Sequence, residues 1–168
     1  MTNITIRAAE PDDYEGICEA MSQPIAQANT LQLPYPTLEM WKKRLADVAP
    51  EAKSLVAIVE GKIVGNLGLQ PASKAVRRRH VGAVGMAVHD AYRGKGVGSA
   101  LMAAAIDLAD NWMQYTRLEL EVYTDNHAAI ALYKKFGFVI EGTHPKDSFR
   151  NAQYIDCYSM GRLKPETR

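Results

Sequence analysis

The sequence has little cysteine and almost no net charge. Its 168 residues include two cysteines, Cys18 and Cys157, which are too few for a disulfide framework and are typical of a reducing compartment. Lysine and arginine total 20 against 19 aspartates and glutamates, so the formal net charge is +1. Such a balance gives no overall field that would favour nucleic acid or an anionic membrane. Any anion-binding site must therefore be local.

Long apolar runs are also absent. No stretch approaches the about 18 consecutive apolar residues that read as a membrane-spanning helix, and the beginning MTNITIRAAEPDD lacks the basic start and apolar centre of a signal peptide. We therefore expect a cytoplasmic protein that does not enter a membrane. The length and the 47% of hydrophobic residues suit a single α/β domain over residues 1–168.

Hydrophobic periodicity predicts an irregular alternation of strands and helices. The expected strands are residues 4–9, 54–60, 63–70, 80–89, 117–124, 137–143 and 152–163. The expected helices are residues 11–21, 37–48, 97–112 and 128–136, with Val48 and Trp112 on their apolar stripes. Residues 22–36 contain three prolines and predict a loop that forms a mobile wall of a pocket.

The stretch AYRGKGVGSALM, residues 91–102, places glycine at 94, 96 and 98 between a strand and a helix. The first amides of a helix have no partner within it, and glycines let a ligand approach the main chain closely. The helix dipole and the cations Arg93 and Lys95 favour negative charge there. The segment therefore predicts a site for a pyrophosphate.

Three phosphate-binding patterns compete for this segment. A P-loop needs Ser or Thr after its lysine, but Gly96 follows Lys95, and the dinucleotide fingerprint needs a glycine where Ser99 stands. The pattern R-x-x-G-x-G fits, and it resembles the coenzyme A loop of the Gcn5-related N-acetyltransferase (GNAT) family. A second stretch, LEVYTDNHAAIALYKKFGF at residues 120–138, resembles that family's other signature.

The resemblance covers nearly the whole chain. Within the family, residues 110–143 and the later RNAQYIDCYSM look most like the YhhY-type L-amino acid N-acetyltransferases, with phosphinothricin and ribosomal-protein alanine acetyltransferases as more distant relatives. It implies a mixed sheet of about seven strands, splayed between the fourth and fifth and flanked by about four helices, with Gly85 a candidate bulge at the splay. It also implies acetyl-CoA as the cofactor, held by Met86, Ala87, Val88, Arg93, Gly94, Lys95, Gly96, Val97, Gly98, Ser99, Asn126 and Tyr133.

Acetyl transfer requires two proton movements, because the amine must lose a proton and the departing thiolate must gain one. Tyr133 resembles the family's proton donor, and an ordinary phenol with a pKa of about 10 is protonated at neutral pH. Glu119 and Glu121 share one face of a strand, and Glu121 stands twelve residues before Tyr133, the spacing of the catalytic glutamate in ribosomal alanine acetyltransferases. A water relay, His80 and His89 remain alternatives for the base.

The acceptor is expected to be a small-molecule amine. The resemblance places its site at the first two helices, their loop and the loop between the last two strands, and the candidates are Gln32, Tyr35, Trp41, Phe149, Arg150 and Asn151. Arg150 suits the carboxylate of a free amino acid, although it could instead pair with Asp147 or Asp156. The aromatic residues suit an apolar side chain, in agreement with the YhhY-type enzymes.

We therefore predict direct acetyl transfer from acetyl-CoA to an apolar L-amino acid in a ternary complex, by a homodimer. The alternatives are a protein N-terminal acetyltransferase, a phosphinothricin-type enzyme and an acyl-CoA sensor without turnover. The basic stretch KAVRRRH at residues 74–80 lacks interleaved aromatic residues, so we expect a solvated loop and no nucleic-acid partner. The histidines and cysteines have no metal-ligand spacing, and we expect no metal.

Overall fold

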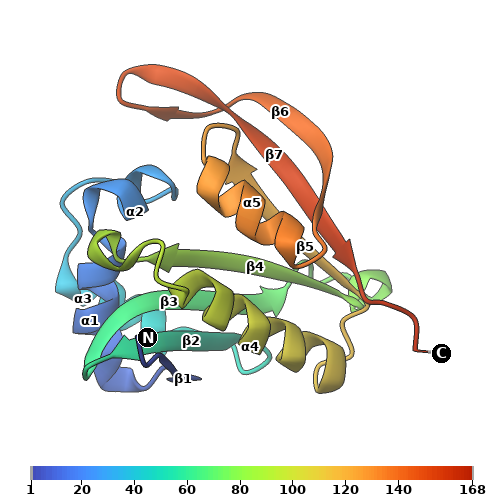
Figure 1. The fold of residues 1–168 in the computed structure, drawn as a ribbon, viewed down its shortest axis with the longest axis horizontal. Helices are drawn as coiled ribbons and strands as arrows, with labels where there is room; N and C mark the ends of the chain where they lie inside the picture. Colours follow the sequence, from blue (N-terminus) through green and yellow to red (C-terminus); the bar gives the residue numbers. More distant parts are fainter. Residues whose placement is uncertain (1, 168) are drawn as a thin grey trace. The chain divides into compact units, whose positions relative to one another are not determined.

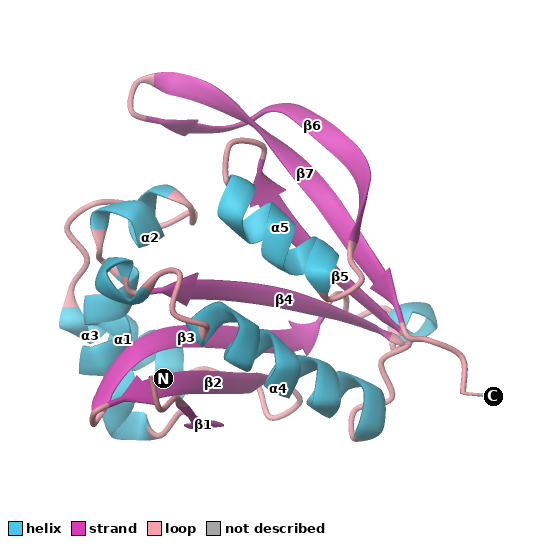
Figure 2. Ribbon diagram, viewed as in Figure 1, coloured by secondary structure: helices cyan, strands magenta, loops and turns pink. Residues whose placement is uncertain are grey.

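The computed structural model describes residues 2–167. Seven strands are hydrogen-bonded in the order β1-β2-β3-β4-β5-β7-β6, as can be followed in Figure 1 and Figure 2. The strands are β1 Thr5–Ala8, β2 Lys53–Val59, β3 Lys62–Pro71, β4 Val81–Val88, β5 Arg117–Tyr123, β6 Val139–Arg150 and β7 Gln153–Leu163. The α-helices are α1 Tyr14–Met21, α2 Pro24–Ala28, α3 Leu38–Ala46, α4 Val97–Asn111 and α5 His127–Lys135. The predicted seven-stranded mixed sheet is confirmed.

The contacts of the chain fall into two compact units. The first holds residues up to Leu69 together with Met86–Ala105, and the second holds Gln70–Gly85 together with the chain from Ile106 onward. Strand β4 and helix α4 each contribute to both units.

The sheet of the first unit is an antiparallel meander. Strand β1 pairs with β2 from Thr5 opposite Ile58 to Ala8 opposite Leu55, and β2 pairs with β3 across a tight turn. The turn residues Glu60 and Gly61 have φ values of +50° and +77°, which match the twist that a two-residue hairpin requires. The turn lies one residue earlier than residues 61–62, which separate the two expected strands 54–60 and 63–70.

Helices cover this meander with apolar side chains. Ile17 and Cys18 of α1 pack with Trp41 of α3 and Val56 of β2 in one buried cluster. The beginning of α4 lies directly on β3, because a Cβ at Gly65 would come within 3.0 Å of the side chains of both Val97 and Leu101. Removing this apolar surface from water anchors the first turn of α4.

The second unit begins with a short parallel ladder. Strand β4 pairs with β5 at three positions, the last joining Ala83 to Glu119, although both strands continue beyond it. This early end of the ladder agrees with the predicted splay between the fourth and fifth strands. Gly85 lies past the end of the ladder, and a Cβ there would meet nothing within 4 Å.

Beyond β5 the second unit continues as an antiparallel sheet. Strand β5 pairs with β7 from Arg117 opposite Leu163 to Tyr123 opposite Cys157, and β6 and β7 form the long twisted hairpin seen in Figure 1. Helix α5 ends at Lys135 with Phe136 as its C-cap, and Gly137 follows with a φ of +90°, the left-handed conformation that is common directly after a helix.

Four predictions about the elements are wrong. There are five α-helices instead of four, because α2 forms inside the expected loop of residues 22–36. The expected loop between the last two strands is a two-residue turn, Asn151 and Ala152, because β6 extends to Arg150. Helix α3 ends at Ala46, so Val48 lies beyond it. Helix α4 ends at Asn111, and Trp112 beyond it is 76% exposed instead of buried.

Candidate functional site

The glycine-rich stretch forms an exposed loop between β4 and α4. Gly94 and Gly96 have φ values of +71° and +86°, in the left-handed region that only glycine enters without strain. Gly98 lies within α4 and has no such need. Two of the three glycines are therefore required by the backbone of the loop itself.

The loop leads into a helix start that suits an anion. The amide of Ala100 donates to the carbonyl of Gly96 at 3.0 Å and begins the helical ladder, so the amides before it in α4 are available to a ligand. No acidic residue stands in the first turn of α4. Arg93 and Lys95 are exposed beside it, and the Lys95 Nζ lies 5.2 Å from the centre of the Tyr92 ring. This charge distribution favours a phosphate group.

The end of β4 precedes this loop in the same unit. Ala87 is buried, and Met86 and Val88 are partly exposed. The residues from Met86 to Ser99 thus form one continuous stretch, with a strand end, a short turn, an exposed glycine loop and a helix start. The bare left-handed backbone and the available amides fit the pyrophosphate of a coenzyme.

Two residues of the short turn before the loop are tied to the rest of the first unit. His89 is buried, its amide donates to the Val64 carbonyl at 2.8 Å, and its Nδ1 accepts from the Ala91 amide at 3.1 Å. The Asp90 carboxylate accepts two amide hydrogen bonds from the start of α2. The sequence around Asp90 gives no sign of this contact, because its partners lie more than sixty residues away along the chain.

Tyr133 lies on α5 in the second unit and is buried. Its ring is tilted against that of Phe138, with centres 5.9 Å apart. Burial raises the pKa of the Tyr133 phenol to about 12, because the charged phenolate loses its hydration. The group is therefore protonated at neutral pH, as a proton donor must be.

Asn126 caps the same helix. Its Oδ1 accepts a hydrogen bond from the Ala129 amide at 3.3 Å. The carbonyl oxygen of the Asn126 side chain thus fills the usual role of an asparagine at the start of a helix. The side-chain NH₂ group is a separate donor that the cap does not use.

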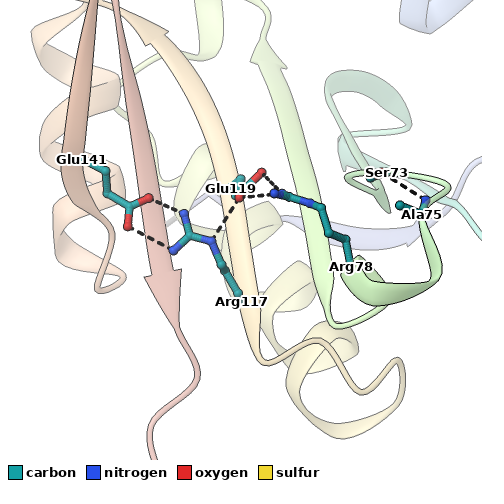
Figure 3. Close-up of polar contacts among 6 residues, drawn as sticks. All are labelled: Ser73, Ala75, Arg78, Arg117, Glu119 and Glu141. Atoms are coloured by element: carbon teal, nitrogen blue, oxygen red, sulfur yellow. Dashed lines mark hydrogen bonds and ion pairs between the residues drawn. The ribbon is translucent and has the colours of Figure 1, made fainter.

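Glu119 and Glu121 lie on β5, and their surroundings differ. Figure 3 shows Glu119 between Arg78 and Arg117. The Glu119 carboxylate accepts from Arg117 Nε at 3.0 Å and from Arg78 at 2.9 Å, and Arg117 also binds Glu141 through both of its terminal nitrogens. The pKa of Arg117 is raised, first by Glu141 and then by Glu119, and Arg117 lowers the pKa of Glu141. Glu119 is therefore held as the centre of an ion-pair chain.

Glu121 is exposed, and no cation pairs with it among residues 2–167. It stands opposite Ser159 of β7, two residues along β5 from Glu119. Of the two glutamates on this face, Glu121 is the one whose carboxylate remains available to accept a proton.

The alternative bases are placed less favourably. His80 is exposed and precedes β4, where its carbonyl accepts from the amides of Thr116 and Arg117. The His89 Nδ1 is already an acceptor for the Ala91 amide, so its ring proton lies on Nε2, which is 3.7 Å from Glu19. Both histidines therefore have structural contacts.

Arg150 lies at the end of β6 and is paired with Asp125, with its guanidinium 5.2 Å from the centre of the Tyr123 ring. The sequence alternatives of Asp147 or Asp156 as its partner are wrong. Asp147 instead accepts from Ser148, and Asp156 accepts from the Lys146 amide. The adjacent Phe149 is exposed against Tyr154, and Asn151 occupies the turn with a φ of +48°.

The acceptor candidates of the first unit differ in exposure, since Trp41 is buried and Tyr35 is exposed. Gln32 accepts a hydrogen bond from Arg44 at 2.5 Å, and the Arg44 guanidinium lies 5.0 Å from the centre of the Trp41 ring. Trp41 itself is only 8% exposed and belongs to the core, with its indole N–H unpaired. Tyr35 is 95% exposed, with a φ of +60°.

Other chemistry has little support in the part of the chain that the structure describes. Cys18 and Cys157 are both unpaired and buried, and burial raises the pKa of the Cys157 thiol to about 11, so this sulfur is not a thiolate nucleophile at neutral pH. Between residues 2 and 167 no three histidine, cysteine, aspartate or glutamate side chains gather to hold a metal ion. None of the described helices combines the length and apolar character needed to cross a membrane.

Comparison with known proteins bears on the whole chain. The model of the acetyltransferase (GNAT) family matches residues 19–138. The L-amino acid N-acetyltransferase AaaT of Escherichia coli is 46% identical over 164 residues, which cover 98% of this chain and 100% of that protein. An N-alpha-acetyltransferase of Saccharolobus solfataricus is 30% identical, over 95% of this chain and 93% of its own.

Solved structures have the same fold. A GNAT-family acetyltransferase from Streptococcus pneumoniae is 31% identical with a TM-score of 0.82, over 96% of this chain and 100% of its own. A phosphinothricin acetyltransferase from Sinorhizobium meliloti, solved in complex with acetyl-CoA, superposes with a TM-score of 0.87 at 20% identity, over 97% of this chain and 89% of its own. At that identity the second likeness concerns the fold alone.

Proposed function

The chain belongs to the GNAT acetyltransferase family, and from this premise we propose that its acceptor is a free L-amino acid with an apolar side chain. The protein is an N-acetyltransferase that uses acetyl-CoA. The observation that carries the amino-acid acceptor is the 46% identity with AaaT over 98% of the chain. Because that match leaves almost nothing out, we also propose that the chain works as one acetyltransferase domain.

We propose that acetyl-CoA is held by the stretch from Met86 to Ser99. The amides from Gly94 to Ser99, with Arg93 and Lys95, would bind the pyrophosphate, and the main chain of Met86, Ala87 and Val88 would bind the pantetheine arm. The left-handed glycines and the absence of acidic residues from the first turn of α4 support this assignment. The NH₂ group of Asn126, which the helix cap leaves available, is proposed as a further donor to the coenzyme.

Acetyl-CoA supplies the acetyl group as an activated thioester. We propose that Tyr133 gives its phenolic proton to the departing sulfur, which the raised pKa supports because the proton is present at every physiological pH. Glu121 would accept the proton of the amine, directly or through water, and the absence of a paired cation among residues 2–167 supports its availability. Transfer would then be direct, without a covalent enzyme intermediate.

The two glutamates of β5 give a matched test of the base. Glu121→Gln keeps the shape of the side chain and removes its proton affinity, so we expect kcat to fall at least tenfold with a small change in stability. Glu119→Gln should weaken the ion-pair chain and lower stability while kcat stays within about twofold. A Glu121→Gln enzyme with wild-type kcat would leave a water relay as the base.

We propose that Arg150 binds the carboxylate of the amino acid by exchanging its partner Asp125 for the substrate. Gln32, Tyr35, Trp41 and Asn151 are proposed to contact the rest of the acceptor. The test uses an amino acid and its carboxamide, which differ only in the charged group. Arg150→Ala should raise KM for the acid and leave the amide unaffected, whereas Asp125→Asn should lower KM for the acid. Equal effects of Arg150→Ala on both acceptors would refute the clamp.

We further propose a homodimer in the cytoplasm. Strand β6 ends the sheet order, and its first two residues, Val139 and Ile140, are exposed apolar side chains that a second copy of the chain would cover. The unpaired Cys18 and Cys157 support a reducing compartment. Sedimentation equilibrium of the wild type and of Ile140→Lys tests the assembly, because only a dimer built on this edge should dissociate in the variant.

The experiment that decides the acceptor is thiol release from acetyl-CoA by the full chain. The panel contains free L-amino acids, phosphinothricin, polyamines and short peptides, and Tyr133→Phe is measured beside the wild type. Turnover with an apolar amino acid, strongly reduced in Tyr133→Phe, supports the proposal. Turnover with peptides alone would indicate a protein N-terminal acetyltransferase, and coenzyme A binding without any turnover would indicate an acyl-CoA sensor.

A further inference from the structure

The Asp90 carboxylate bridges two parts of the first unit that are far apart in sequence. Its Oδ2 accepts from the Ile25 amide and its Oδ1 accepts from the Ala26 amide, each at 2.9 Å. Asp90 begins the short turn Asp90–Tyr92, and the glycine loop follows that turn at once. One side chain thus connects the start of α2 to the segment that leads into the proposed acetyl-CoA loop.

Helix α2 has no local device that could replace this contact. Its first residue is Pro24, which has no amide hydrogen, and Gln23 before it makes no side-chain cap bond. The amides of Ile25 and Ala26 are therefore the free donors of the helix start, and Asp90 accepts from both. A five-residue helix is far too short to be stable alone. The carboxylate of Asp90 therefore helps to fix its position, together with the buried Ala26.

The turn that carries Asp90 is firmly placed. The His89 amide donates to Val64 of β3, and the His89 ring meets the Tyr92 ring edge to face with centres 5.5 Å apart. Tyr92 in turn lies under the Lys95 ammonium of the glycine loop. Lys95 of the glycine loop is thus connected to the turn of Asp90 through the rings of Tyr92 and His89, and Asp90 is bonded to α2.

We propose that Asp90 is a positioning residue that couples coenzyme binding at the glycine loop to the placement of residues 23–36, which begin with α2. This inference rests on the proposed function, in which Gln32 and Tyr35 of that segment contact the acceptor. Coenzyme binding orders the loop, and the Asp90 carboxylate then holds α2 in the position that receives the amino acid. By thermodynamic linkage the amino acid tightens coenzyme binding by the same factor.

The first arm of the test is independent of the acceptor. Amide hydrogen exchange of residues 22–30 is followed in the full chain with and without coenzyme A, for the wild type, Asp90→Asn and Asp90→Ala. Coenzyme A should slow exchange in the wild type. It should not do so in Asp90→Asn, which keeps one acceptor oxygen but loses the charge, or in Asp90→Ala, which loses both acceptor oxygens. Equal protection in Asp90→Asn, or none in the wild type, overturns the coupling.

The second arm measures the coupling factor with L-methionine as the probe. The Kd of coenzyme A is titrated with and without saturating L-methionine, and we expect a ratio in the roughly 5–150-fold range of allosteric couplings in the wild type. In Asp90→Asn the ratio should fall toward one and the KM of the amino acid should rise, while the Kd of coenzyme A alone changes less than twofold. A ratio that is unchanged in Asp90→Asn overturns the proposal.

Asp13→Asn is the matched control. The Asp13 carboxylate also accepts from a main-chain amide at a helix start, that of Glu10, and it pairs with Arg7, but it is not part of the glycine loop or of α2. This variant should lose stability and keep the wild-type coupling. If the wild type fails to acetylate L-methionine and every other free amino acid while the exchange arm succeeds, the proposed acceptor is wrong and the coupling through Asp90 stands.

Discussion

The backbone of the glycine loop gives the sharpest quantitative prediction. Replacing Gly94 by Ala introduces a methyl group that meets nothing within 4 Å, so any effect comes from the φ of +71° and not from a clash. Holding alanine in the left-handed region costs roughly 1–2 kcal/mol. Because Gly94 lies in an exposed loop that is free to relax, we expect the unbound enzyme to escape this strain and the bound enzyme to incur it.

The cost should therefore appear in coenzyme binding. A free-energy difference of about 1–2 kcal/mol corresponds to a roughly 5- to 30-fold higher Kd for coenzyme A, with little change in the free energy of unfolding. Gly61→Ala is the matched control, because Gly61 has a φ of +77° and equally open space around its Cβ position. Its turn is fixed by the β2–β3 ladder, so its strain should appear in stability, as a Tm lower by roughly 2–8 °C, with coenzyme binding unchanged.

Isothermal titration with coenzyme A and thermal unfolding of the same preparations measure both quantities. The reasoning fails if Gly94→Ala binds coenzyme A as tightly as the wild type. It also fails if the two variants lose coenzyme binding to the same extent, since strain in a distant hairpin would then have the same effect as strain in the loop.

Three further outcomes follow from individual groups. Tyr133→Phe should lower kcat by roughly 10²–10⁴-fold, with a smaller change in the KM of acetyl-CoA. Because the phenol pKa is raised to about 12, loss of this proton should not reduce the kcat of the wild type at any pH below 10. Both results are measured by thiol release. Asp110→Ala leaves the buried Arg162 without its carboxylate, now 2.8–2.9 Å away, and should cost about 3–5 kcal/mol in urea unfolding. Arg7 lowers the pKa of Asp13, so at a pH above the ordinary carboxyl pKa their pair stabilises the fold. This stability is lost as the pH falls through the lowered pKa. Asp13→Asn should therefore reduce the free energy of unfolding at pH 7 and make that free energy depend less on acid pH in urea titrations.

The sequence could predict features that depend on local chemistry. Strict alternation defines β5, and a glycine loop between a strand and a helix start indicates the anion site, because both patterns arise from backbone geometry within about ten residues. Helix α2 could not be predicted in this way. It has five residues and begins with proline, and its cap comes from Asp90, 64 and 65 residues away along the chain.

The extension of β6 was hidden for a related reason. Residues 144–150 alternate poorly and include Pro145, which reads as a loop. The structure accommodates the proline within a register shift between His144 and Ser148, where the pairing with β7 is interrupted and then resumes to Arg150. The partner strand, and not the local sequence, therefore makes this segment a strand.

The contrast between Glu119 and Glu121 shows where local reasoning ends in the candidate site. Alternation along β5 correctly predicts that both carboxylates share one face, and it treats them as equivalent. The difference comes from Arg78, 41 residues away, and from the Arg117–Glu141 pair, which close around Glu119 only when β4 lies beside β5 and β6 has returned beside β7. Both oxygens of the Glu119 carboxylate accept hydrogen bonds from arginine side chains, whereas no cation pairs with Glu121 among residues 2–167. The choice of Glu121 as the proposed base therefore depends on the sheet order, which no spacing within β5 contains.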